Sequence, residues 1–306
     1  MFESSYQVIE NIHQAVEHRD FHAKVQDNDA NLSSKESIKL IHQYWDYKQT
    51  YRAQIRNRNV RRLMDRFAMK LTPAENIIGL EKLANIPGGA IVTSNHFSPL
   101  ENTAVRSAIR HAGYRNLSIV SQETNLMATY PLRFIFWNYD LLPIASQGGG
   151  MEYMGREFPQ RLSDTLNQGT PVLIYPEQEM WFNYRKPRPL QRGAYYYAAR
   201  FEVPIISLFV EIIDESELAN DDFYKTHYRV HVLDPIYPDP NESIKVNSTR
   251  MQALDYQQKY AAYEQAYQRP LTYDWEPTDI AGLRPRLQDE LLAEIDETKQ
   301  SIDQSN

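Results

Sequence analysis

Short apolar runs alternate with helical stretches through the middle of the chain, and this alternation constrains the fold more than any other feature. Each run is short enough for a buried strand, and the stretches between them are long enough for helices. Such an alternation predicts an α/β sheet, in which functional residues follow the strand ends. The predicted strands are residues 91–93, 117–121, 140–144, 172–175, 203–210 and 228–233.

The flanking regions have helical periodicity. One amphipathic helix is expected within residues 1–31, and a second begins near Ser33, which forms a capping-box pattern with Glu36, and should continue to Pro73. Later helices are predicted at residues 98–111, 125–136, 151–167, from 193 onward and at 244–267, with a fraying acidic helix at 288–306. The last strand alternates polar and apolar residues, which is typical of an edge strand.

Composition limits the classes of protein to consider. With 306 residues, 42% of them apolar, the chain can bury a full core. It contains no cysteine, which excludes disulfides, thiol nucleophiles and cysteine metal sites. The net charge of -7 argues against general nucleic-acid binding. The start of the chain resembles no signal peptide, and no apolar run approaches the roughly 20 residues of a membrane span, so we expect a cytoplasmic protein that is not integral to a membrane.

Residues 48–70 predict a basic amphipathic helix. Eight Lys and Arg residues accompany a single acid, Asp65, and Tyr51, Ile55, Leu63 and Phe67 recur at multiples of four. Such a helix can lie on an anionic membrane surface, here the inner face of the cell membrane. It can equally pack on the core through its apolar stripe. RNA binding is less favoured, because no aromatic platform accompanies the charges.

The strongest candidate for chemistry is His96, which follows the predicted strand 91–93. A helix starting at Ser98 would place Glu101 in its first turn, where its carboxylate can orient one imidazole nitrogen and leave the other facing a cleft. The same residues fit a capping box, with Pro99 at the first helical position, in which Glu101 only binds backbone. Taken alone, the local pattern favours the cap.

Several blocks, in order, resemble the glycerolipid acyltransferases of the lysophosphatidic acid acyltransferase type. Residues 95–101 resemble the N-H-x-S-x-x-D block of that family, and Tyr175-Pro176-Glu177 matches the start of its F-P-E-G-T-R-S block. Further similarity lies at residues 79–87, 141–144, 192–194 and 203–205, so the resemblance covers about residues 78–235. It implies a mixed, largely parallel sheet flanked by helices, with an N-terminal helical segment at 1–72, an acyltransferase domain at 73–245 and a helical extension at 246–306.

The resemblance implies that His96, oriented by Glu101, deprotonates an acceptor hydroxyl that attacks the thioester of acyl-CoA or acyl-carrier protein. The partners are then a lysolipid acceptor, an acyl donor and an anionic membrane surface, without nucleic acid, metal or another cofactor. A hydrolase using the same His96 is a competitor, and a non-catalytic lipid- or partner-binding protein on the same fold is the main alternative. The implied substrate-binding residues are Asn95, Ser98, Glu177, Gln178, Glu179, Arg185, Lys186 and Arg188.

The departures from the family pattern concern charge. Glu101 stands where the family has Asp, Ala145-Ser146 where it usually has Asp-Arg, and Gln178-Glu179-Met180-Trp181 where it has Gly-Thr-Arg-Ser. A carboxylate at Glu179 would repel a phosphomonoester. Either the acceptor carries a different headgroup, or the basic loop at residues 185–188 supplies the missing charge.

Overall fold

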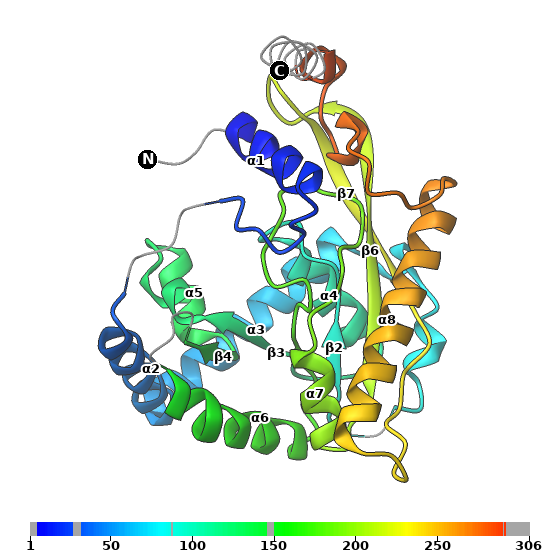
Figure 1. Ribbon diagram of the computed structural model, residues 1–306. Coiled ribbons are helices and arrows are strands. Elements are labelled where there is room, and N and C mark those ends of the chain that lie inside the picture. Colours follow the sequence, from blue (N-terminus) through cyan, green and yellow to red (C-terminus); the bar gives the residue numbers. More distant parts are fainter. Residues whose placement is uncertain (1–4, 27–31, 87, 146–149, 290, 292–306) are drawn as a thin grey trace, which may run out of the picture.

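The fold is built on one seven-stranded sheet, seen in a computed structural model that describes residues 5–26, 32–86, 88–145, 150–289 and 291 (Figure 1). The strand order is β1-β7-β6-β2-β5-β3-β4, and only β6 and β7 pair antiparallel. The predicted mixed, largely parallel sheet is therefore confirmed. The strands are β1 (Ile77–Ile78), β2 (Ile91–Thr93), β3 (Ser118–Gln122), β4 (Leu141–Ile144), β5 (Val172–Leu173), β6 (Ile205–Leu218) and β7 (Tyr224–Val232).

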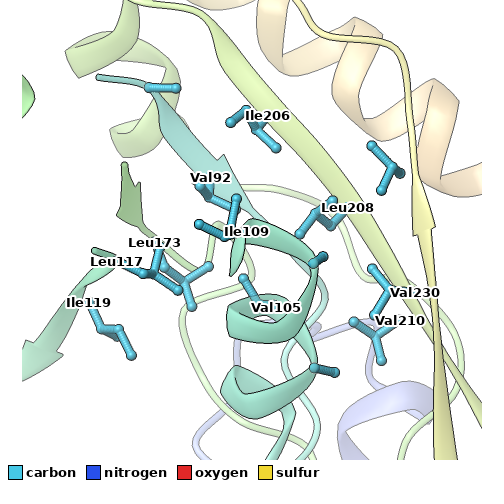
Figure 2. Packing of buried hydrophobic residues seen from close by; sticks show 14 of the residues in the cluster. Val92, Val105, Ile109, Leu117, Ile119, Leu173, Ile206, Leu208, Val210 and Val230 are labelled. Atoms are coloured by element: carbon cyan, nitrogen blue, oxygen red, sulfur yellow. The ribbon is translucent and has the colours of Figure 1, made fainter. Parts of the chain in front are cut away.

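Both faces of the central strands are buried, because neighbouring side chains along a strand point to opposite faces. The helices are α1 (Ser5–Glu17), α2 (Ser34–Gln49), α3 (Tyr51–Leu71), α4 (Glu101–His111), α5 (Leu132–Asn138), α6 (Phe158–Asn167), α7 (Gly193–Arg200) and α8 (Ile244–Tyr267). Val92, Leu173 and Ile206 belong to the core cluster beneath α3 and α4, as Figure 2 shows for their packing on Val105 and Ile109. The adjacent Ile91, Val172 and Ile205 join the cluster under α6, α7 and α8.

The predicted helix from Ser33 to Pro73 is two helices. The capping box of Ser33 and Glu36 starts α2 as expected. At Thr50 the backbone becomes extended, with φ -72° and ψ 145°. The Thr50 hydroxyl accepts a hydrogen bond from the Ala53 amide at 3.2 Å and donates one to the Tyr47 carbonyl at 2.8 Å. One threonine thus ends α2 and caps α3, because its side chain satisfies backbone groups on both sides of the break.

Helix α3 packs on the core through small side chains and leaves the predicted apolar stripe in solvent. Ala53, Val60 and Ala68 are buried. The stripe residues are exposed, with fractional exposures of 78% for Tyr51, 46% for Ile55, 61% for Leu63 and 41% for Phe67. Of the two alternatives for residues 48–70, packing on the core through this stripe is therefore wrong, because the smaller residues form the face that packs against α4.

The prediction of an edge strand at residues 228–233 was also wrong. The two-residue strand β1 pairs in parallel with the outer side of β7, with Ile77 opposite Val230. The helix expected at 125–136 is a 3-10 turn, Glu123–Met127, followed by α5. The fraying helix predicted at residues 288–306 lies almost entirely outside the described residues.

A separate cluster joins α1 to the last described segment of the chain (Figure 1). Ile9 and Ile12 of α1 pack in this cluster with Trp181, Ile280 and Leu283. The chain after α1 then crosses the loop that follows β5: the Trp181 indole donates to the Ala23 carbonyl at 3.0 Å. We call residues 18–26 the N-terminal strap. None of the helices in the described ranges is both long and apolar enough to cross a membrane.

Candidate active site

The chain leaves β2 through Ser94 and Asn95, and Asn95 fixes the direction of the turn. Its side-chain amide donates to the Val210 carbonyl at 3.0 Å, and its side-chain oxygen accepts from the Val210 amide at 2.8 Å. Asn95 is 2% exposed. Its polar atoms are therefore occupied by β6, so its place in the structure is that of a residue that positions His96 rather than one that contacts substrate.

His96 and Glu101 form a hydrogen-bonded pair at the end of β2. Imidazole Nδ1 contacts Glu101 Oε1, and the carboxylate is buried at 1% exposure while the imidazole is 20% exposed. Among the described residues, Nε2 of His96 has no hydrogen-bond partner. One nitrogen is thus held by a buried carboxylate and the other is available for proton transfer, which is the geometry of a general base.

The second oxygen of Glu101 binds the backbone of the turn that precedes α4, whose N-cap residue, Leu100, makes no side-chain cap hydrogen bond. Oε2 accepts hydrogen bonds from the Phe97 amide at 2.6 Å and from the Ser98 amide. Glu101 therefore both orients His96 and binds backbone, one role for each carboxylate oxygen, but α4 begins at Glu101 and not at Ser98 as the predicted capping box required. The Phe97 and Ser98 amides are occupied by Glu101 and are not open to a substrate oxyanion.

Glu177 and Arg188 support the backbone of His96 from the loop after β5. Glu177 Oε2 accepts from the His96 amide at 3.1 Å, and an Arg188 guanidinium nitrogen lies 3.4 Å from the His96 carbonyl oxygen. The two side chains pair at 3.1 Å and are almost fully buried. Arg188 also donates to the Phe21 carbonyl of the strap at 2.9 Å. The burial lowers the pKa of Arg188, and the Glu177 charge opposes that effect.

The other two cations of the basic loop are also paired inside the protein. Arg185 lies 2.6 Å from Asp214 and donates to the Thr278 carbonyl at 3.1 Å. The Lys186 ammonium lies 2.6 Å from Asp279, with both side chains buried. Burial raises the pKa of Asp279, while the Lys186 charge opposes that shift. The structure therefore does not place Arg185, Lys186 or Arg188 where a substrate phosphate would be bound, because each charge already has a partner.

The remaining predicted site residues lie around the pair. Ser98 is buried, and its hydroxyl accepts from the Leu100 amide at 3.1 Å. Gln178 is exposed and holds φ +67°, the left-handed conformation that favours glycine, at the position where the family block has Gly. Glu179 is half-buried beside it. Of these residues, Gln178 and Glu179 are the ones left open to solvent near the His96 loop.

Tyr175 lies against His96, although the sequence identified it only as a strand end and as the first residue of a family block. Its ring stacks on the His96 imidazole with centroids 4.0 Å apart and planes inclined by 8°. The signal that marks it is its position, two residues after the buried strand β5 and two residues before Glu177.

A family model matches the part of the chain that carries this geometry. Residues 76–211 match the family described as Acyltransferase. That segment contains the His96–Glu101 pair, the loop after β5 and the first part of β6. The match to the acyltransferase model therefore covers the part of the chain where the sequence blocks had indicated a resemblance.

Among solved structures, the chain is similar to the 1-acyl-sn-glycerophosphate (LPA) acyltransferase PlsC from Thermotoga maritima. The likeness covers 87% of this chain and 98% of that one, with a TM-score of 0.45 and 12% sequence identity. No curated protein matches the chain in the sequence comparison.

Proposed function

We propose that this protein transfers an acyl group from acyl-CoA or acyl-carrier protein to the hydroxyl of a lysolipid. The observation that carries the proposal is the His96–Glu101 pair, with Nδ1 held by a buried carboxylate and Nε2 without a partner among the described residues. Nε2 takes the proton of the acceptor hydroxyl as its oxygen attacks the thioester carbonyl. The tetrahedral intermediate then expels the thiolate, which takes the proton back from the imidazolium.

The acceptor that we propose is a lysolipid with a phosphodiester or sugar headgroup. Residue 146, where the family has an arginine, lies outside the described residues, and the three cations of the basic loop are paired with Asp214, Asp279 and Glu177. A phosphomonoester requires clustered or bidentate cations, and a nearby carboxylate such as Glu179 opposes its binding. Lysophosphatidic acid should therefore compete poorly with such an acceptor.

We further propose that the protein works on the inner face of the cell membrane, bound through the exposed side of α3. This side mixes Tyr51, Ile55 and Leu63 with the exposed cations Arg52, Arg58, Arg62, Arg66 and Lys70. The neighbouring α5 adds Leu132 and Phe134, which are 52% and 39% exposed. Apolar and cationic side chains on one face favour an anionic bilayer surface, because they combine acyl-chain contact with attraction to headgroups.

The deciding experiment offers the purified protein a panel of lysolipids with acyl-CoA or acyl-carrier protein and identifies the products by mass spectrometry. The expected product is a diacyl lipid made by the wild type and absent with His96→Ala. His42→Ala provides the matched control, since that histidine lies on α2 and pairs with Glu157. Folded protein without transfer to any acceptor would favour the non-catalytic alternative, and release of free fatty acid alone would favour a hydrolase.

A further inference from the structure

Tyr175 is the aromatic neighbour of the candidate base. The ring lies flat on the His96 imidazole, at 4.0 Å between centroids and 8° between planes. The hydroxyl is buried, and the polar group that it faces is the Glu101 carboxylate. A buried hydroxyl that faces the carboxylate of a reactive pair can change how strongly that carboxylate acts on its partner.

The hydroxyl lies within electrostatic reach of Glu101, the carboxylate that orients His96. Burial, and then the negative charge of Glu101, raise the pKa of Tyr175 well above its ordinary value of 10.0. Tyr175 therefore stays protonated over the working pH range and presents a neutral O–H dipole to the carboxylate. Such a dipole withdraws part of the negative charge that Glu101 offers to the imidazole.

The ring acts on His96 in the opposite sense. The face of an aromatic ring is electron-rich, so a stacked ring stabilises a cation more than a neutral group. The imidazolium that forms when His96 accepts the acceptor proton is such a cation. Flat stacking also restricts rotation of the imidazole, which keeps Nδ1 on Glu101 and Nε2 on the open side.

We propose that Tyr175 is a positioning residue that sets the proton affinity of His96, with the ring favouring the imidazolium and the hydroxyl weakening the pull of Glu101. The other charged groups beside His96 are Glu177 and Arg188, which contact its backbone amide and carbonyl. Tyr228 reaches the turn through Ser98 at 3.4 Å. These neighbours stay in place when Tyr175 is replaced, so their contribution is constant. The role in catalysis rests on the proposed acyl transfer, whereas the effect on His96 does not.

The test is to titrate His96 by NMR in histidine-labelled protein, with the signal assigned by its loss in His96→Gln. Tyr175→Phe keeps the ring and removes the dipole, so the His96 pKa should rise. Tyr175→Leu and Tyr175→Met also remove the ring, so the His96 pKa should be lower in them than in Tyr175→Phe. A rise with Tyr175→Phe and a drop from Tyr175→Phe to the ringless variants are the two opposite shifts expected, and the absence of either would overturn the proposal. Circular dichroism establishes which variants are folded, and Tyr175→Phe alone still decides the sign for the hydroxyl.

The kinetic readout is the pH profile of kcat/KM. Tyr175→Phe should move the acid limb to higher pH, and loss of the ring should lower kcat about tenfold with KM little changed. Tyr197 provides the matched control, because it stacks on Phe201 at 5.9 Å and 9° on the surface of α7. Tyr197→Phe and Tyr197→Leu should leave the His96 titration as in the wild type. Opposite NMR shifts in a protein that transfers no acyl group would support the pairing and refute the proposed function.

Discussion

Glu177 and Arg188 hold both ends of a single residue, His96, between them. The carboxylate accepts from the His96 amide at 3.1 Å, and the guanidinium lies 3.4 Å from the His96 carbonyl oxygen. The pair itself is buried, with exposures of 2% and 0%. The loop after β5 thus acts as a clamp on the backbone of the candidate base, and the clamp depends on an internal ion pair.

Replacing Arg188 should lower the free energy of unfolding more than replacing Glu177. Arg188→Met leaves the Glu177 carboxylate buried without its counter-ion, which costs about 3–5 kcal/mol in the free energy of unfolding. Glu177→Gln keeps a hydrogen-bonding group and should cost less. Urea unfolding followed by circular dichroism measures both. The exposed Arg58→Met should change stability by less than about 0.5 kcal/mol, and an equally small loss for Arg188→Met would refute the clamp.

Replacing Glu101 should affect activity and stability together, because each carboxylate oxygen has its own task. Glu101→Gln keeps only one acceptor oxygen, so we expect kcat to fall about 10²-fold or more and the start of α4 to lose about 1 kcal/mol. Glu101→Asp retains the charge and should be milder in both respects. Steady-state kinetics and urea midpoints provide the comparison. If Glu101→Gln keeps the wild-type kcat, the Glu101 carboxylate serves only to bind the backbone amides of Phe97 and Ser98.

Binding to vesicles should depend on the exposed face of α3 in two separable ways. Ile55→Ser and Leu63→Ser should weaken sedimentation with anionic vesicles at every salt concentration, since they remove apolar contact. Arg58→Gln and Arg62→Gln should reduce the salt dependence, which becomes steep once the Debye length falls below about 8 Å.

The matched control for Ile55→Ser is Ile244→Ser on α8, because the two side chains are similarly exposed, at 46% and 42%. It should bind vesicles as the wild type does. An equal effect of both substitutions would indicate general hydrophobicity and would argue against a docking face on α3.

Stability should decrease in alkali because buried tyrosines resist ionisation in the folded state. Burial raises the pKa of Tyr153 from 10.0 to about 12. At pH values below the pKa of this tyrosine in the unfolded chain, Tyr153 is protonated in both states and does not change the free energy of unfolding. As pH rises from there toward the folded-state pKa, the unfolded state loses the proton first and is therefore stabilised relative to the folded state. The urea midpoint of unfolding should therefore fall as pH rises from about 8 to 11, and it should fall less steeply in Tyr153→Phe than in the wild type. The 82% exposed Tyr130 supplies a control, since Tyr130→Phe should keep the wild-type slope.

The sheet and the His96–Glu101 pair were predictable because their determinants are local. Apolar runs such as Ile91–Thr93 mark central strands whatever surrounds them. His96 and Glu101 are five residues apart, so a single turn can bring them together. The family blocks then placed the loop after β5 at the same edge of the sheet.

The roles of the basic loop and of α3 were not predictable, because they depend on distant partners. Lys186 pairs with Asp279, 93 residues further along the chain, and nothing in a proline-rich basic loop indicates that its charges turn inward. On α3 the periodicity identified large apolar residues, whereas the packing face is built from Ala53, Val60 and Ala68. Helical periodicity is recognised from large apolar side chains, whereas close packing between helices favours small side chains.

The N-terminal strap gives the site a particular order of assembly during synthesis. Arg188 donates a hydrogen bond to the Phe21 carbonyl, which is synthesised before it. Lys186 donates to Asp279 and to the Asp274 carbonyl, which are synthesised after it. A nascent chain that has reached only β6 therefore carries Lys186 without its counter-ion Asp279, whereas Arg185 and Arg188 already have Asp214 and Glu177. We expect the loop after β5 to reach its final structure only when residues 274–279 have left the ribosome, so the sheet can form on the growing chain before the candidate site is complete.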